Sequence, residues 1–324
     1  MIPGDAPAKP RVREPSVQGT ESCPGAEILR WRRELRALGG DPRSLDWLLD
    51  AAGGLTPSLL QALLLHPERS VTLLTAKRAV EALWRQHVVD AVPLQYSVGH
   101  CHWRDVVIGV GPGVLIPRPE TELLVDLAME FWGEAASLSS DGLLWADLGT
   151  GSGCLALALA LAFPARQGLA VDVSRVALDR AHHNLAVADL LSRVRVVEGH
   201  WLQALQPWWG RLALVVANPP YIPSGVVDQL EPVVRDHEPR LALDGGQDGL
   251  DCLRDIVASA PQALAPGGWL LLEHHHDQGQ RVLDLLAQHG LVDGQSHADL
   301  NGHRRFASGR RPFSKADFTS PSRS

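Results

Sequence analysis

The stretch LWADLGTGSGCL, residues 144–155, decides the fold class that we expect for this chain. It opens as a short apolar run, passes through three glycines at alternate positions and leads into a second apolar run that suits a helix. Glycines let backbone approach a ligand closely, and the first turn of a helix presents free N–H groups. The stretch therefore predicts a strand, a tight loop and a helix, with either a ligand site or a plain turn at the loop.

The spacing of the glycines and the acid before them narrow the choice of ligand. The loop reads G-x-G-x-G, whereas dinucleotide-binding loops carry G-x-G-x-x-G. Asp147 precedes the loop, and its carboxylate would repel a pyrophosphate but could hold the cationic amino group of a methionine moiety. The candidate cofactor-binding residues of the loop are Gly149, Thr150, Gly151, Ser152 and Gly153.

A second acidic residue follows the next apolar run. Asp172 comes about 20 residues after the glycines, near the end of the run 168–173. A carboxylate at this place typically accepts hydrogen bonds from two ribose hydroxyl groups. The alternative is helix capping, which Asp172 or Ser174 could perform for the helix that we expect from Ser174. Together with the glycine loop, Asp172 favours a nucleoside site.

The motif Asn218-Pro219-Pro220-Tyr221 follows another apolar run directly and indicates the chemistry. Two prolines hold the backbone extended, but a structural turn needs neither Asn before them nor an aromatic residue after them. The Asn218 side chain and the Pro219 carbonyl can each accept one N–H of a planar NH2 group, and Tyr221 can pack on its flat face. The motif therefore predicts a site that presents such a nitrogen to an electrophile, with a structural turn after a buried strand as the alternative.

Apolar runs alternate with helical segments through the larger, C-terminal part of the chain. We expect strands at 106–110, 143–148, 168–173, 194–197, 212–217 and 269–272, and helices around 153–163, 174–188 and 249–264. This alternation predicts an α/β fold with βαβ units and a mostly parallel sheet. Ligands of such sheets bind beyond the carboxyl ends of the strands, which is where the three motifs lie.

The sequence before residue 93 has a different pattern. Apolar residues recur there at helical spacing, and Thr56 followed by Pro57 is typical of a helix start. We expect several short helices that pack as a small N-terminal bundle. Residues 1–24 are rich in Pro, Gly and charge and are expected to be a disordered leader, and residues 312–324 a flexible tail.

Length, charge and cysteine content limit the classes of function that the chain can have. The 324 residues suffice for a catalytic domain and a smaller companion. The net charge of -7 argues weakly against nucleic acid as the main partner, because phosphate neutralisation needs clustered Lys and Arg. The 4 cysteines have no metal-ligand spacing, and no apolar run is long enough to span a membrane. We therefore expect a cytoplasmic protein with no membrane partner, no direct nucleic-acid partner and no metal.

The motifs together resemble those of the class I methyltransferases that modify planar NH2 groups. More narrowly, the chain resembles the release-factor glutamine methyltransferase family of the HemK/PrmC type, from about residue 25 to Arg310. The resemblance rests on PLQYSVG (93–99), VLIPRPETE (114–122), residues 147–153 and 218–221, RDHEPRLAL (235–243), Gly249, LEH (272–274) and Arg305-Phe306.

The resemblance implies a Rossmann-like class I methyltransferase domain at 123–311, a mostly parallel twisted sheet with helices on both faces. A linker with a short hairpin at 93–122 would join it to a helical domain at 25–92. Because this helical domain carries no catalytic motif, we expect it to dock the protein substrate. The implied reaction methylates the side-chain amide nitrogen of the glutamine in the Gly-Gly-Gln motif of peptide-chain release factors. S-adenosylmethionine would be the cofactor and S-adenosylhomocysteine the product of a monomeric enzyme.

The resemblance also assigns roles to residues. It places the cofactor at the glycine loop, Asp172, Trp201 and Asn218, and the glutamine at residues 218–221, with Asn218, Pro219 and Tyr221 as catalytic residues and Pro220 beside them. Trp201 could lie on the adenine ring or be ordinary core packing. His200 stands where the family usually has an acid, which puts the cofactor affinity in question.

Several alternatives remain open from the sequence. The substrate could be a glutamine of a ribosomal protein, or the exocyclic amine of adenine in nucleic acid. The chain could also be a noncatalytic module that binds a release factor. Arg118, Glu120 and Glu122 could shape the entry of the glutamine or form salt bridges between the two domains.

Overall fold

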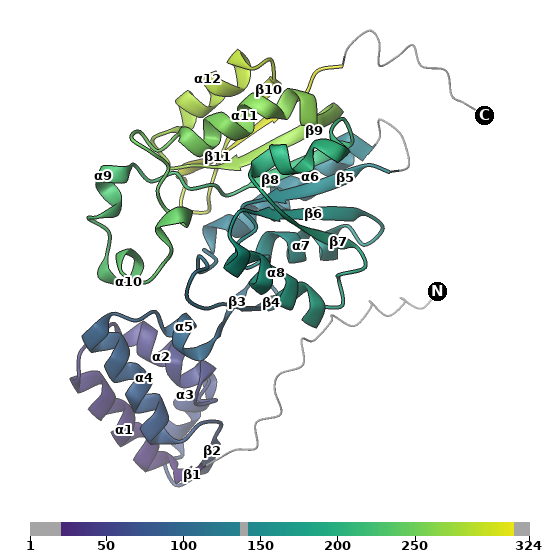
Figure 1. The fold of residues 1–324 in the computed structure, drawn as a ribbon. Helices are drawn as coiled ribbons and strands as arrows, with labels where there is room; N and C mark the ends of the chain where they lie inside the picture. The colour runs from purple at the N-terminus through teal and green to yellow at the C-terminus, as the bar shows by residue number, and fades with distance from the viewer. Residues whose placement is uncertain (1–20, 137–141, 314–324) are drawn as a thin grey trace, which may run out of the picture. The chain divides into compact units, whose positions relative to one another are not determined.

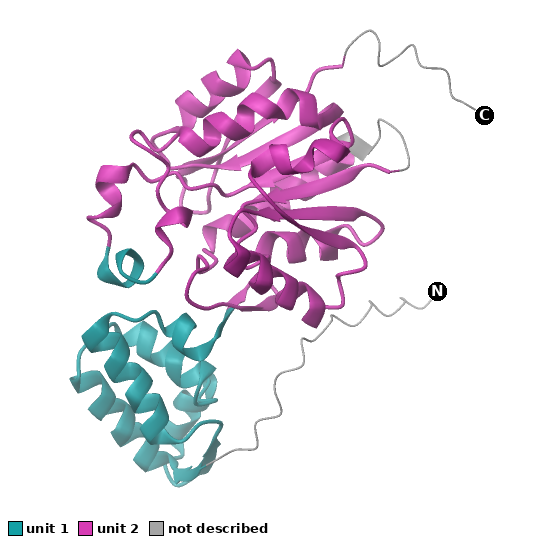
Figure 2. Ribbon diagram, in the orientation of Figure 1, with its two compact units in different colours: residues 1–101, 231–237 teal, residues 102–230, 238–324 magenta. Residues whose placement is uncertain are grey.

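The computed structural model describes residues 21–136 and 142–313. The chain divides into two compact units (Figure 2). The first consists of the residues up to Cys101 together with Glu231–His237, and the second of His102–Leu230 and Glu238–Ser324. The division therefore falls inside the predicted linker at 93–122, and a short segment far along the sequence belongs to the N-terminal unit.

The first unit is a bundle of short helices around its own apolar core (Figure 1). Asp41 and Thr56 cap two of these helices by accepting hydrogen bonds from the Ser44 and Leu59 N–H groups. The core includes Trp31 and Trp84. The helices are α1 (Gly25–Ala37), α2 (Pro42–Ala51), α3 (Pro57–Leu65), α4 (Lys77–Asp90), α5 (Leu94–Val98) and, from the later segment, α10 (Pro232–Arg235).

A two-stranded sheet in this unit corrects the prediction for the leader. Strand β1 (Glu21–Pro24) pairs antiparallel with β2 (Ser70–Leu73), so these four residues of the predicted leader are ordered. The Glu21 carboxylate accepts a hydrogen bond from the Lys77 N–H at the start of α4. Both contacts join residues far apart in sequence, which is why local composition did not reveal the strand. Residues 1–20 and 314–324, the rest of the predicted leader and nearly all of the predicted tail, lie outside the described residues.

The second unit is an α/β domain built on a seven-stranded sheet in the order β10-β11-β9-β8-β5-β6-β7. Strands β5 to β9 pair parallel with one another, and β11 pairs antiparallel with both β9 and β10. The strands are β5 (Leu144–Leu148), β6 (Gln167–Asp172), β7 (Val194–Glu198), β8 (Leu212–Ala217), β9 (Leu264–Glu273), β10 (Val292–Ala298) and β11 (Arg304–Arg310). The hairpin of β3 (His100–Trp103) and β4 (Val106–Gly109) precedes the sheet.

Helices cover both faces of the sheet (Figure 1). One face packs against η2, α11 and α12 in a continuous apolar core. Helix α7 contacts both α6 and α8, α6 also contacts β8 and β9, and α8 also contacts β6 and β7. The helical elements are η1 (Glu120–Glu122), α6 (Leu123–Ala136), α7 (Cys154–Ala162), α8 (Arg175–Val187), η2 (Trp201–Trp208), α9 (Ser224–Val227), η3 (Arg240–Ala242), α11 (Asp251–Ala263) and α12 (Gly279–Gln288). Within the described residues, no helix is long and apolar enough to cross a membrane.

The order of the strands places the three motifs side by side. The chain runs from β5 outward through β6 to β7 and then returns to β8 on the other side of β5. The last residues of β5 and β8 are in register, Leu148 opposite Ala217, so the glycine loop and Asn218 leave the sheet at one edge. Such a point, where the strand order reverses, is the usual place for a ligand in an open α/β sheet.

Candidate active site

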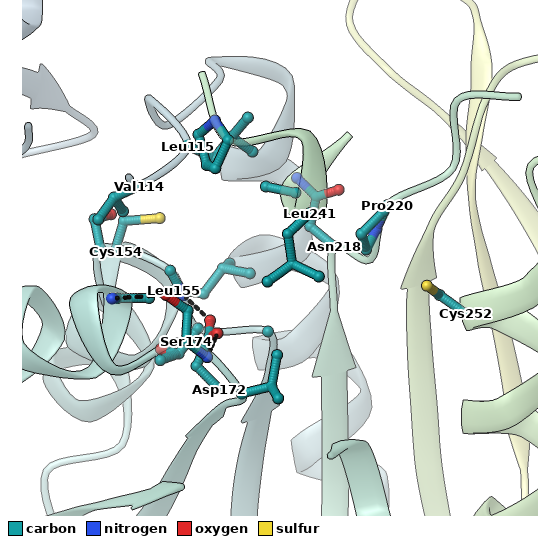
Figure 3. A pocket seen from close by; sticks show the side chains of 18 of the residues that line it. Val114, Leu115, Cys154, Leu155, Asp172, Ser174, Asn218, Pro220, Leu241 and Cys252 are labelled. Atoms are coloured by element: carbon teal, nitrogen blue, oxygen red, sulfur yellow. Dashed lines mark hydrogen bonds between the residues drawn. The ribbon is translucent and has the colours of Figure 1, made fainter. Parts of the chain in front are cut away.

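A cavity opens at this edge of the sheet (Figure 3). It encloses about 1170 Å³ of space, part of it open to solvent, and its walls are mainly apolar with a few polar groups. Eight of the predicted site residues line it: Gly149, Thr150, Gly151, Ser152, Asp172, Trp201, Asn218 and Pro220. The other three predicted site residues, Gly153, Pro219 and Tyr221, are not among the described residues that line the cavity.

The glycine loop adopts a backbone conformation that residues other than glycine rarely adopt. Gly149, Gly151 and Gly153 have φ angles of 70°, 55° and 80°. A Cβ atom on Gly149 would lie 3.0 Å from Cζ3 of Trp201, and one on Gly153 would lie 3.1 Å from the Cα of Ala181 in α8. The glycines therefore allow the turn and let Trp201 and α8 approach the loop.

Asp147 lies beneath the loop rather than in the cavity wall. Its Oδ2 accepts hydrogen bonds from the Thr150 hydroxyl at 2.6 Å and from the Ala156 N–H at 3.1 Å. The side chain is fully buried, and burial raises the pKa of its carboxyl to about 7. The sequence placed this carboxylate against the amino group of a ligand. In the structure Oδ2 holds the loop and the first turn of α7, Oδ1 is buried without a hydrogen-bond partner among the described residues, and the contact with an amino group stays a prediction.

Asp172 ends β6 and faces the cavity (Figure 3). Its two oxygens accept hydrogen bonds from the Gly151 and Ser174 N–H groups, both at 2.9 Å. The cap of α8 is Ser174, whose hydroxyl accepts from the Ala177 N–H. Each carboxylate oxygen can accept a further hydrogen bond. Burial raises the pKa of the Asp172 carboxyl, and the hydrogen bonds from the backbone lower it by a smaller amount. The carboxylate holds the loop and also faces the cavity.

Trp201 begins η2 with a positive φ of 42°, which is unusual for a bulky side chain. The residue lines the cavity and also packs against the sheet core. Its Nε1 is buried without a hydrogen-bond partner among the described residues. His200 lines the cavity next to it, with its ring 5.6 Å from the Trp201 ring. Trp201 is therefore part of the cavity wall and packs against the core, and its contact with an adenine ring stays a prediction.

Asn218 is joined to Tyr221 by a chain of side-chain hydrogen bonds. Its Nδ2 donates to the Thr121 hydroxyl at 3.0 Å, and that hydroxyl donates to Oε2 of Glu273 at 2.7 Å. The Tyr221 hydroxyl donates to Oε1 of the same carboxylate at 3.1 Å. Thr121 and Glu273 are buried, and burial raises the pKa of Glu273 to about 7. The Asn218 and Tyr221 side chains are therefore set by one buried group.

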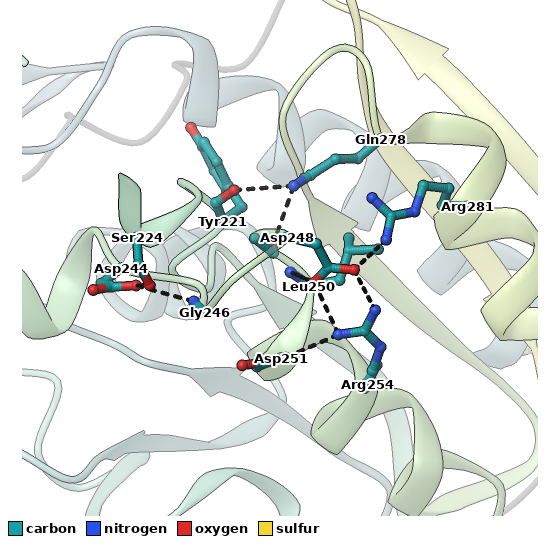
Figure 4. Close-up of polar contacts among 11 residues, drawn as sticks. Tyr221, Ser224, Asp244, Gly246, Asp248, Leu250, Asp251, Arg254, Gln278 and Arg281 are labelled. Atoms are coloured by element: carbon teal, nitrogen blue, oxygen red, sulfur yellow. Dashed lines mark hydrogen bonds and ion pairs between the residues drawn. The ribbon is translucent and has the colours of Figure 1, made fainter. Parts of the chain in front are cut away.

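The backbone of Tyr221 is held as well (Figure 4). The Gln278 side chain donates from Nε2 to the Tyr221 carbonyl at 3.0 Å and to the Gly249 carbonyl at 3.2 Å. Its oxygen accepts from the His275 N–H at 2.9 Å. Because every polar group of this amide has a partner in the protein, the segment that follows β8 has little freedom to move.

The charged residues of η1 and of the segment before it make their contacts within the second unit. The Arg118 guanidinium, which lines the cavity, pairs with the buried Glu238 carboxylate at 2.6 Å. Glu238 also accepts a hydrogen bond from the Ile116 N–H. The Glu122 carboxylate accepts one from the Arg104 N–H in the hairpin turn. Arg118 is therefore part of the cavity wall, and Glu122 holds the hairpin turn. The role of Glu120 stays open between the two alternatives that the sequence offered.

Known proteins are similar to this chain over most of its length. The family described as "Methyltransferase small domain" matches residues 135–236. A release factor glutamine methyltransferase of Prochlorococcus marinus is 45% identical over 286 residues, which cover 88% of this chain and 97% of that relative. One of Gloeobacter violaceus is 43% identical over 264 residues, covering 80% of this chain and 87% of the relative. The chain belongs to the release factor glutamine methyltransferase family.

A solved structure shows the same fold at low identity. The hMettl16 catalytic domain, in complex with the MAT2A 3'UTR hairpin 6, has a TM-score of 0.52 and is 14% identical over 76% of this chain and 86% of that chain. This likeness concerns the fold alone. The expected class I methyltransferase fold, with helices on both faces of the sheet and a helical region before it, is confirmed.

Two residues of the site in this family member were not singled out from the sequence. Thr121 and Glu273 lie in segments that carried the resemblance, but neither was placed near Asn218. A signal was present, since Glu273 is an acid directly after the apolar run 269–272. The carboxyl end of that strand lies at the same edge of the sheet as those of β5 and β8. An acid at this edge is a candidate site residue, because ligands bind beyond the carboxyl ends of parallel strands.

Proposed function

We propose that this chain methylates the side-chain amide nitrogen of the glutamine in the Gly-Gly-Gln motif of peptide-chain release factors. One observation carries the proposal, the orientation of Asn218 at the cavity. Its NH2 group donates to Thr121, so the amide oxygen is turned away from Thr121 and is the group that can accept from a substrate N–H. Relatives that are 45% and 43% identical over 88% and 80% of this chain are named release factor glutamine methyltransferases, which supports the proposal.

S-adenosylmethionine is the cofactor that this cavity would hold. The loop at 149–153 supplies close backbone approach, and Asp172 offers its remaining lone pairs to ribose hydroxyl groups. Trp201 supplies an aromatic face and His200 a ring nitrogen for the adenine, and Asn218 borders the same space. When bound, S-adenosylmethionine supplies an electrophilic methyl group and leaves as S-adenosylhomocysteine.

The residues after β8 position the glutamine. The Asn218 side-chain oxygen and the Pro219 carbonyl each accept one N–H of the substrate amide, and Tyr221 packs against its plane. A neutral amide nitrogen is a poor nucleophile, so orientation has to supply most of the rate. Holding two reactants in a reactive geometry can contribute roughly 7–11 kcal/mol. The nitrogen loses its proton to water after it has gained the methyl group.

The N-terminal unit is proposed to dock the protein substrate. Residues 25–92 have their own apolar core and carry no motif of the predicted site. A release factor is much larger than its glutamine, and a second compact unit offers surface for the remainder. We place the reaction in the cytoplasm, with a monomeric enzyme.

Methyl transfer from radiolabelled S-adenosylmethionine to a panel of substrates tests the proposal. The panel contains a release factor, the same factor with its Gly-Gly-Gln glutamine replaced by alanine, a glutamine-methylated ribosomal protein in its unmodified form, and an adenine-containing RNA. Label in the first substrate alone is the expected result. Label in the ribosomal protein or the RNA, with none in the release factor, would replace this proposal with one of the alternatives.

A further inference from the structure

Three side chains from distant parts of the chain form one line of hydrogen bonds. Asn218 follows β8, Thr121 lies in η1, and Glu273 ends β9. The residues in the two bonds are 97 and 152 positions apart in sequence. The chain thus gathers these groups by folding, and their order in space has a chemical direction.

The carboxylate at the end of the line sets that direction. Above its pKa of about 7 the Glu273 carboxylate is ionised and only accepts, so in that state the Thr121 hydroxyl gives its single proton to Glu273. The Thr121 oxygen can then only accept from Asn218, and an accepting oxygen selects the NH2 side of the amide. A flipped Asn218 would put two acceptors opposite each other, with no proton between them.

Burial makes this selection strict. Thr121 and Glu273 are 2% and 1% exposed, so water does not compensate a mismatch. A buried acceptor that loses its donor costs about 1–3 kcal/mol, which corresponds to a population ratio of roughly 5- to 150-fold. Asn218 itself is only half-buried and borders the cavity, where both of its orientations would otherwise be open to it.

We propose that Thr121 and Glu273 are positioning residues that hold the Asn218 amide with its oxygen available to the substrate, and so select an acceptor that carries an NH2 group. The inference rests on the proposed function and deepens it. The same carboxylate holds the Tyr221 hydroxyl, so the side chains on both sides of the substrate amide depend on Glu273.

The consequence for specificity follows from the matching of donors and acceptors. An Asn218 oxygen that faces the substrate attracts the N–H groups of glutamine and repels the carboxylate of glutamate. A flipped amide would present N–H groups, which suit a glutamate carboxylate or turn the glutamine around. Selection of one substrate therefore includes a repulsive element against the other.

Replacing Thr121 tests the direction of the line. Thr121→Val keeps the shape but removes the hydroxyl, whereas Thr121→Ser keeps the hydroxyl. With a release factor as substrate, we expect kcat of Thr121→Val to fall about 10- to 100-fold, the scale of a lost buried hydrogen bond in a positioned group. Thr121→Ser should recover kcat to within about 3-fold of wild type, since its hydrogen bonds can form again. Affinity for S-adenosylhomocysteine, measured by calorimetry, should stay near wild type in both variants and shows that the cavity is folded.

A matched control removes another buried hydroxyl. Ser308 in β11 is fully buried and its hydroxyl contacts His297, outside the line of Asn218. Ser308→Ala should leave kcat with the release factor unchanged. If Ser308→Ala lowers kcat as much as Thr121→Val does, the loss reflects general loosening and the positioning role is wrong.

Two further measurements separate positioning from stability. Glu273→Gln keeps shape and removes the acceptor-only group, and the double variant with Thr121→Val should be no slower than the slower single variant, because both act through Asn218. Competition by a release-factor peptide with glutamate in place of the Gly-Gly-Gln glutamine should become stronger in Thr121→Val relative to the glutamine peptide. Additive losses in kcat, or an unchanged preference between the two peptides, would overturn the inference while the proposed function stands. A wild-type enzyme that methylates no release factor would overturn both.

Discussion

Replacing Asn218 with Asp should reduce glutamine methylation by about 10²-fold or more while sparing cofactor binding. The substitution keeps the size of the side chain and an acceptor oxygen, but it removes the NH2 group that donates to Thr121 across 3.0 Å. A second oxygen then faces the Thr121 hydroxyl, whose proton is already given to Glu273. The new half-buried carboxylate and the buried Glu273 carboxylate then compete for one proton.

The magnitude follows from the two ways in which this conflict can be relieved. Thr121 can turn its proton to the new carboxylate and leave an oxygen of Glu273 without a donor, which costs about 1–3 kcal/mol. The new carboxylate can instead take up a proton or lie near a second negative charge in a poorly screened interior, with a similar or larger cost. A total near 3 kcal/mol in the transition state corresponds to about 10²-fold in rate.

Single-turnover methyl transfer to a release factor measures this loss directly. The same factor with its Gly-Gly-Gln glutamine replaced is the blank, and calorimetry with S-adenosylhomocysteine reports the cofactor site. Asn301→Asp is a matched control, because it adds the same charge at an exposed position far along the chain. Near wild-type transfer by Asn218→Asp would refute the reasoning, since an acceptor alone would then suffice and the matching of the amide would be irrelevant.

Three further predictions concern the cofactor, the pH dependence of stability and the N-terminal unit. Asp172→Ala should weaken S-adenosylmethionine binding by about 1–3 kcal/mol in calorimetry, and an unchanged affinity in a folded variant would remove Asp172 from the site. Burial raises the pKa of the Asp147 carboxyl from 3.8 to about 7 and that of Glu273 from 4.5 to about 7, so the folded state binds these protons more tightly than the unfolded state. Their contribution to stability is therefore fully present below pH 3.8 and is lost as pH rises through about 7, with a slope on the order of 1.4 kcal/mol per pH unit for each group. Urea unfolding between pH 5 and 8 should show this fall in the wild type and a shallower one in Asp147→Asn, whereas equal slopes would contradict the account of this buried acid. A chain that begins at Ala91 should bind S-adenosylmethionine but methylate a release factor poorly, and equal kcat/KM for the shortened and full-length chains would exclude docking by the helical unit.

The elements that the sequence predicted well are those with a local cause. Apolar runs of the right length predicted β5 to β8 closely, and Thr56 before Pro57 predicted the start of α3. The glycine loop was recognisable because its positive φ angles demand glycine at fixed positions. Strands β10 and β11 were missed. Most side chains of β10 are exposed or half-buried, so its sequence has no apolar alternation, and pairing with β11 holds it in the sheet.

The parts of the site that the sequence could not give depend on contacts between distant residues. The hydrogen-bond partner of Asn218 lies 97 residues away in the sequence, and no spacing rule connects Thr121 with Glu273, which are 152 positions apart. The surroundings of Asp147 could not be predicted for the same reason. The sequence indicated a ligand contact before the loop, and the structure adds that Thr150 and the α7 backbone donate to Oδ2 beneath the loop.

Mapping the methyl group on the substrate tests the central claim most directly. A release factor is incubated with the enzyme and S-adenosylmethionine, and tandem mass spectrometry of its peptides locates the modification. The account predicts one added methyl on the side-chain amide of the Gly-Gly-Gln glutamine, formed by the wild-type enzyme and nearly absent with Asn218→Asp. A methyl group on another residue, or an unmodified release factor under conditions where the enzyme binds its cofactor, would contradict it.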